Sequence, residues 1–80
     1  MKAQLEKFMN RFSTIIWKSN GFELEIASCD IDYWNMADDI LRIHMEWGEI
    51  NIFLGNASIT LKDNGLELKN SHNELFTIYI

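Results

Sequence analysis

The segment 29–39 holds the densest group of side chains that could bind a cation or a partner in this 80-residue sequence. Asp30-x-Asp32 begins as a calcium-binding loop does. The later positions do not fit, because such a loop needs an oxygen ligand where Trp34 stands and a glycine where Asn35 stands. A weak magnesium site stays open at the two aspartates that end the segment, Asp38 and Asp39. We predict neither a resident metal nor a cofactor.

Nucleophilic or acid–base chemistry has little support in the other residues. Cys29 has no His or basic residue beside it in the sequence to activate its thiol. His44 and Glu46 alternate on a predicted strand with Arg42, about 7 Å apart along one face, and such a trio could transfer protons. Charged residues in this arrangement more often form a cross-strand network on a solvated sheet face. We therefore expect a protein that is not an enzyme.

The segment 29–39 also has the composition of a protein interface. Tyr, Trp and Met are enriched at the buried centres of interfaces, and charged residues lie at the rim. The alternative is that Tyr33 and Trp34 close one end of the core, with a short helix over residues 35–40. The candidate partner-binding residues are those of this segment and two glutamates of a preceding strand: Asp30, Asp32, Tyr33, Trp34, Met36, Asp38, Asp39, Glu23 and Glu25.

Acidic residues are concentrated in the middle of the chain. The net charge is −5, and residues 22–49 hold eight acidic side chains against Arg42 alone. Such a field repels nucleic acid and speeds encounter with a basic surface. A solvated acidic face that only keeps the protein in solution is the alternative. We expect a protein partner with a basic surface, such as the nucleic-acid groove of a nuclease, and no direct binding to nucleic acid or membranes.

Apolar residues at helical spacing predict an amphipathic helix over residues 2–17. The apolar stripe comprises Leu5, Phe8, Met9, Phe12, Ile15 and Ile16. Ser19, Asn20 and Gly21 would end the helix, because Asn and Gly tolerate the left-handed conformation. Trp17 is expected to pack at the end of this helix.

From residue 22 onward apolar and polar residues alternate, which predicts strands with one solvated face. We expect strands over residues 22–28, 40–47, 50–54, 57–62, 66–69 and 75–80. Trp47 continues the buried face of its strand, and Asn64-Gly65 predicts a type I′ hairpin. Short turns pair neighbouring strands antiparallel. The predicted fold is α+β, with one N-terminal amphipathic helix packed on a curved antiparallel meander of five to six strands, in a single domain over residues 1–80.

The last predicted strand is apolar on both faces, so something must cover each side. It either lies centrally under the helix or pairs with the same strand of a second copy. We favour the second arrangement, a homodimer, which would make Phe76, Ile78 and Ile80 the self-association residues.

In size, acidity and lack of a catalytic motif, the chain resembles small phage-encoded inhibitors of bacterial defence, including anti-CRISPR proteins. The resemblance implies a small, acidic, non-catalytic viral protein that inhibits a macromolecular partner through the partner's basic surface. A toxin-neutralising immunity protein or antitoxin is one alternative, and a self-associating structural or accessory module is another. The polar N-terminal residues and the lack of a long apolar run predict a cytoplasmic protein, in the host cytoplasm if it is phage-encoded.

Overall fold

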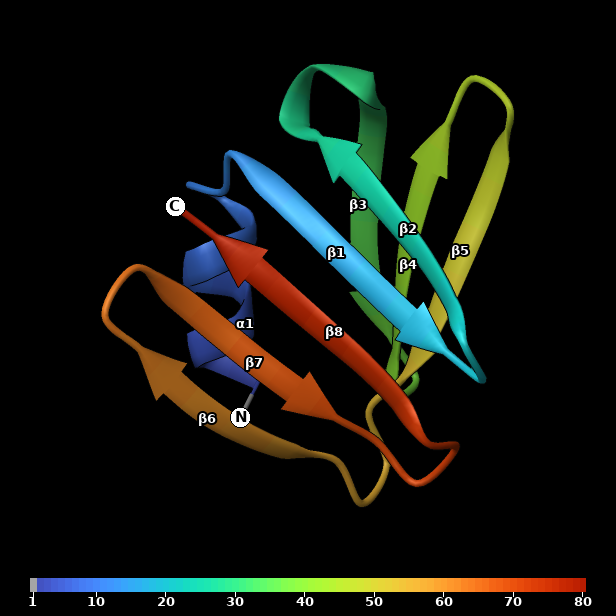
Figure 1. Ribbon diagram of the computed structural model, residues 1–80. Coiled ribbons are helices and arrows are strands. Elements are labelled where there is room, and N and C mark those ends of the chain that lie inside the picture. Colours follow the sequence, from blue (N-terminus) through green and yellow to red (C-terminus); the bar gives the residue numbers. More distant parts are fainter. Residues whose placement is uncertain (1) are drawn as a thin grey trace.

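The computed structural model describes residues 2–80, in which one α-helix precedes a series of antiparallel strands (Figure 1). The helix α1 spans Lys2–Met9, and a short 3-10 turn, η1, spans Ser28–Asp30. The strands are β1 (Thr14–Ser19), β2 (Phe22–Ala27), β3 (Ile31–Ala37), β4 (Ile40–Met45), β5 (Gly48–Phe53), β6 (Ser58–Lys62), β7 (Gly65–Lys69) and β8 (Glu74–Tyr79).

The strands form two sheets. The larger sheet has the order β2-β1-β8-β7-β6, and the smaller has the order β3-β4-β5. Figure 1 shows the smaller sheet behind β1 and β2, and α1 behind β7 and β8, so both cover the same face of the larger sheet. The α+β class with an N-terminal helix and antiparallel pairing is confirmed. A single meander is not what forms, because the chain leaves the larger sheet after β2 and returns to it only at β6.

The core lies where the helix and the two sheets meet. Alternate residues of the strands point into it, as the period of two requires. The buried apolar side chains are Leu5, Met9, Ile15, Ile26, Leu41, Ile43, Met45, Ile50, Ile52, Leu54, Leu66, Leu68, Phe76 and Ile78. Both sheets and α1 therefore share one apolar cluster.

The helix is shorter than the apolar stripe predicts. α1 ends at Met9, and residues 14–19 form β1, so the predicted helix over residues 2–17 is wrong in its second half. Two isoleucines and a tryptophan follow Thr14, and β-branched and aromatic residues favour a strand. Ile15 is fully buried between less buried neighbours, as expected of a strand with one face on the core. Trp17 accordingly lies within β1 and not at a helix end.

β3 takes the place of the expected connector between residues 28 and 40. It pairs with β4 along Ile31–Ala37, and residues 35–40 form no helix. The register shifts between Ile31 and Tyr33, which marks a bulge or irregularity in the strand. The other strands, β2 and β4–β8, overlap the ranges that the alternation predicts.

β8 is the central strand of the larger sheet. It pairs with β1 on one side and with β7 on the other, and Phe76 and Ile78 are fully buried within the chain. Both backbone edges of β8 are therefore occupied. This contradicts self-association by pairing of β8 with a second copy, since of the three predicted residues only Ile80 is exposed.

Two hairpins of the described chain have the backbone signature of a type I′ turn. Asn20 and Gly21 join β1 to β2 with φ angles of 49° and 81°. Asp38 and Asp39 join β3 to β4 with φ angles of 54° and 58°. Positive φ at both turn residues matches the twist of the paired strands. The type I′ turn predicted at residues 64–65 is wrong, because neither residue has positive φ and β7 already begins at residue 65.

No membrane-crossing helix is found in the part of the chain that the structure describes. A helix that crosses a bilayer must be long and apolar, and none of the helices in residues 2–80 meets both conditions.

Candidate functional site

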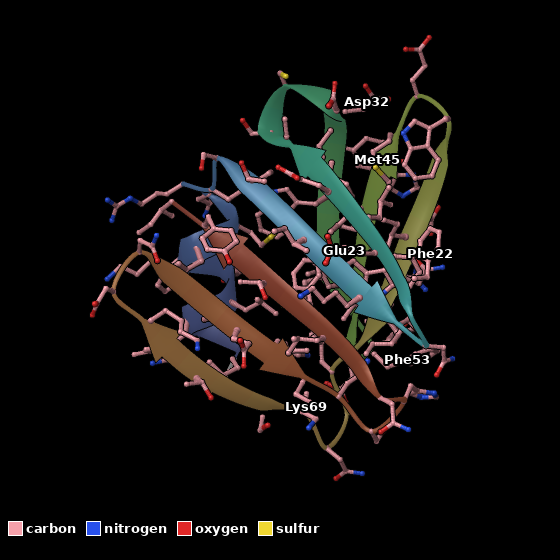
Figure 2. All side chains as sticks on the ribbon, viewed as in Figure 1. Phe22, Glu23, Asp32, Met45, Phe53 and Lys69 are labelled. Carbon is pink, nitrogen blue, oxygen red and sulfur yellow. The ribbon has the colours of Figure 1, made fainter. Side chains whose placement is uncertain are left out.

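A mainly apolar cleft lies between the two sheets, with a volume of about 460 Å³. The β1–β2 hairpin lines one wall, and the start of β5 with the turn before it lines the other. The lining residues are Trp17, Phe22, Leu24, Trp47, Glu49, Ile50 and Asn51. Figure 2 shows Phe22 at the start of β2, on the side of β5. Three aromatic side chains therefore meet at this opening.

The aromatic side chains of the cleft are only partly used by the fold. Trp47 is 63% exposed and Phe22 is 56% exposed. Phe22 packs edge-to-face on Trp17, with ring centroids 5.8 Å apart and an interplanar angle of 69°. Trp17 in turn packs against the buried core. An exposed aromatic surface next to the core is typical of a binding site.

Local turn geometry places these side chains. The Asn20–Gly21 turn brings β2 back along β1, so that Trp17 lies opposite Leu24 and one diagonal step from Phe22.

The β4–β5 hairpin places the third aromatic residue. Met45 pairs with Gly48, which leaves Glu46 and Trp47 as its two turn residues. Trp47 was expected on the buried face because it continues the alternation of β4, and this is wrong because the strand ends two residues earlier.

A second arrangement of polar side chains lies on the outer face of the smaller sheet. The Tyr33 ring stacks on His44 with centroids 4.1 Å apart and an angle of 15°. His44 Nε2 lies 3.3 Å from Oε2 of Glu49, and Arg42 Nε lies 3.9 Å from Oε1 of the same carboxylate. The partner of His44 is therefore Glu49 on the neighbouring strand, not Glu46, which lies in the turn. This is the cross-strand network, and it holds the Glu49 side chain beside the cleft.

The four aspartates of the segment 29–39 do not form one group. Asp30 and Asp32 lie where β3 begins, and Asp38 and Asp39 lie in the turn after it ends. A seven-residue strand spans roughly 20 Å, so the two pairs are at opposite ends of the smaller sheet. Figure 2 shows Asp32 at the end where the β4–β5 turn also lies.

The large side chains of the same segment point to opposite faces of β3. Tyr33 is 55% exposed on the outer face. Trp34 and Met36 are half-buried and pack against the core. This favours the alternative in which Trp34 closes the core. Asp32, Tyr33 and Trp34 line another, more polar hollow of about 410 Å³ next to the end of α1.

The two predicted glutamates of β2 lie on the solvent face of the larger sheet. Glu23 and Glu25 are exposed, and Lys18 Nζ lies 3.3 Å from Oε1 of Glu23. This face points away from Tyr33 on the smaller sheet, so the structure does not bring the predicted partner-binding residues together. Glu23 follows Phe22 in β2, but it does not line the cleft, because neighbouring residues of a strand point to opposite faces.

Among residues 2–80, no three His, Cys, Asp or Glu side chains lie close enough together to bind a metal ion. Comparison with known proteins gives no guide either. No family model, no curated protein and no solved structure matches the chain.

Proposed function

We propose that the chain is a small acidic binding protein that inhibits a macromolecular partner by docking on a basic surface of that partner, without catalysis of its own. The observation that carries the proposal is the aromatic cleft between the sheets, in which Phe22 and Trp47 are more than half exposed. Binding energy at protein interfaces is concentrated in a few aromatic anchors of this kind, surrounded by a charged rim.

The charges around the cleft support a basic partner. Glu49 lines it, Glu46 precedes the exposed Trp47, and Glu23 follows Phe22. Lys18 pairs with Glu23 and offsets part of its charge, so Glu46 and Glu49 are the acidic residues nearest to the cleft. The chain as a whole carries a charge of −5. A cationic surface, such as the nucleic-acid groove of a nuclease, complements this rim and would be blocked by it.

Inhibition is tested with a panel of purified nucleases that have basic nucleic-acid grooves, each assayed for cleavage with and without the protein. We expect one or more of them to lose activity when the protein is stoichiometric. The association rate should fall steeply between about 0.01 M and about 1 M salt, because the Debye length shrinks from about 30 Å to about 3 Å.

Charge-neutral variants provide the control. Replacing Glu23 and Glu46 with Gln should slow association, and replacing Glu67 with Gln on the distant strand β7 should not. An association rate that does not change with salt would contradict the proposal. So would an association rate of the Glu23→Gln, Glu46→Gln protein equal to that of the wild type.

A further inference from the structure

The edge of β5 has backbone groups that no described residue of the chain satisfies. The N–H of Leu54 donates to the carbonyl of Asp39 at 2.8 Å, and hydrogen-bonded pairs in an antiparallel ladder recur every two residues. Ile52 and Ile50 therefore bond to β4. The N–H and C=O groups of Glu49 and Asn51 point the other way, toward the open edge.

This open edge is short and has defined ends. The β4–β5 turn, with Trp47, closes it at one end. At the other end the carbonyl of Phe53 accepts a hydrogen bond from Nδ2 of Asn70 at 3.2 Å. Between these ends, the unpaired backbone groups are those of Glu49 and Asn51. Residues 49–51 also line the aromatic cleft.

The smaller sheet lacks a strand at the place where the apolar surface is exposed. Three strands face a sheet of five, and Phe22 and Trp47 remain uncovered beyond β5. A strand added beside β5 would place alternate side chains in the cleft, against these two rings. Among residues 2–80, β5 pairs with β4 alone, and the β1–β2 hairpin of the larger sheet faces its free edge across the cleft.

The edge of β5 is less protected against pairing than the edge of β3. Proteins block strand edges with bulges, charges or proline. β3 has an irregular register and exposed Asp32. β5 keeps regular pairing over all six residues, and its one carboxylate, Glu49, is drawn toward β4 by His44 and Arg42.

We propose that β5 binds an extended segment of the partner protein as a fourth strand of the smaller sheet, with apolar side chains in the cleft and Lys or Arg side chains on the outer face. This rests on the proposed function, because it names the part of the basic partner that is recognised. The alternation follows from the site, since the inward positions meet Phe22 and Trp47 and the outward positions face solvent, where the net charge of −5 of the chain favours Lys or Arg. A second copy fits less well, because each copy carries a net charge of −5.

The probe is a set of capped heptapeptides with Lys at odd positions and Val, Leu or Phe at even positions, titrated against the full chain by calorimetry. We expect at least one peptide to bind, and the amide hydrogens of Glu49 and Asn51 to become protected from exchange. The same peptide N-methylated at alternate residues, on the amides that face β5, should bind at least about tenfold more weakly.

A matched pair of variants tests the edge itself. Asn51→Pro removes one outward N–H that the fold does not use, and proline is tolerated at a strand edge in that orientation. It should weaken peptide binding at least about tenfold, and Asn51→Ala, which keeps the N–H, should stay within about twofold of wild type. Circular dichroism is used to check that both variants are folded, and the N-methylated peptide tests the same hydrogen bonds without any change to the protein.

Three results would overturn the inference. The first is failure of every peptide to bind, and the second is equal affinity for the N-methylated peptide. The third is a wild-type mass of twice the 9.4 kDa of one chain that falls to the mass of one chain in Asn51→Pro. That result would assign the edge to a second copy. If peptides fail while a nuclease is still inhibited with the expected salt dependence, the strand-addition inference is wrong and the proposed function stands. If peptides bind but no basic partner is found, the proposed function is wrong and the strand-addition inference stands.

Discussion

Trp17 Nε1 donates a hydrogen bond to the carboxylate of Glu74 at 3.2 Å, across 57 residues of sequence. The other carboxylate oxygen accepts from Nδ2 of Asn70 at 2.8 Å, and that amide also donates to the carbonyl of Phe53. The chain of contacts runs from β1 through β8 to the end of β5. It therefore fixes one aromatic wall of the cleft and one end of the open β5 edge relative to each other.

Asn70 should be the polar residue on which stability depends most. It is 6% exposed, and its Oδ1 accepts from the N–H groups of His72 and Glu74 at 3.0 and 3.1 Å. Asn70→Ala leaves two part-buried N–H groups and the carbonyl of Phe53 without these partners, and we expect a loss of about 2 kcal/mol in the free energy of unfolding by urea. Asn35→Ala, on the exposed face of β3, is the control and should change it by less than about 0.5 kcal/mol. Equal stabilities would show that the network contributes nothing.

Gly65 is required for a close approach of β7 to β8. A Cβ at this position would collide with the backbone carbonyl of Ile78, which cannot move without distorting the central strand. Gly65→Ala should lower the melting temperature and cost about 2 kcal/mol or more. Gly55→Ala has open space around it and should be nearly neutral. A Gly65→Ala protein as stable as the Gly55→Ala protein would contradict this account.

The turn at Asp38 and Asp39 carries conformational strain, because both residues have positive φ. The double substitution Asp38→Asn, Asp39→Gly would suit the type I′ turn better, and we expect a gain of about 1 kcal/mol by thermal unfolding. Loss of the exposed contact between Lys2 and Asp39 should subtract little. An unchanged or lower melting temperature would show that the aspartates are favourable there.

The same turn limits how its charges can be tested. Charge reversal to Lys at both positions would disturb the backbone as well as the electrostatics. Asn at both positions removes the charge and keeps a residue that tolerates positive φ. Partner association should be measured with this variant, so that a slower rate reports charge alone.

The tryptophans should separate into structural and binding residues. Trp34 packs against the core, so Trp34→Ala should lower the free energy of unfolding by about 2 kcal/mol. Trp47 is 63% exposed in a turn, and Trp47→Ala should change stability by less than about 0.5 kcal/mol while it weakens peptide or partner binding by about tenfold or more. The opposite pattern, with binding lost at Trp34 and stability lost at Trp47, would move the interface to β3.

Alternation predicts most of the sheet but hides two strands. β1 escapes detection because Phe12, Ile15 and Ile16 also fit the spacing of a helix, and only tertiary pairing with β2 and β8 decides between the two. β3 escapes because the irregularity between Ile31 and Tyr33 interrupts its period of two.

The cleft is harder to predict than the strands. No local sequence pattern indicates that the chain changes sheets at residues 28–30, and the residues that line the cleft come from both sheets. The burial of Trp47 is predicted wrongly because the alternating pattern of β4 continues past the end of the strand. Trp47 lies in the following turn, where its side chain is exposed. Asn20-Gly21, by contrast, is a hairpin signal that the sequence does contain.

The pairing of β1 with β8 has a consequence for the order of folding. Thr14 lies opposite Tyr79, so the middle of the larger sheet joins residues from the two ends of the described chain. The pairing of β3 with β4 and of β4 with β5 is local in sequence and can form while later residues are still being synthesised. The larger sheet has to wait until residues 74–79 leave the ribosome, and such distant pairing slows folding toward the millisecond-to-second range. During translation, β1 can therefore pair with β2 at once, but its other edge stays unpaired until β8 has been synthesised.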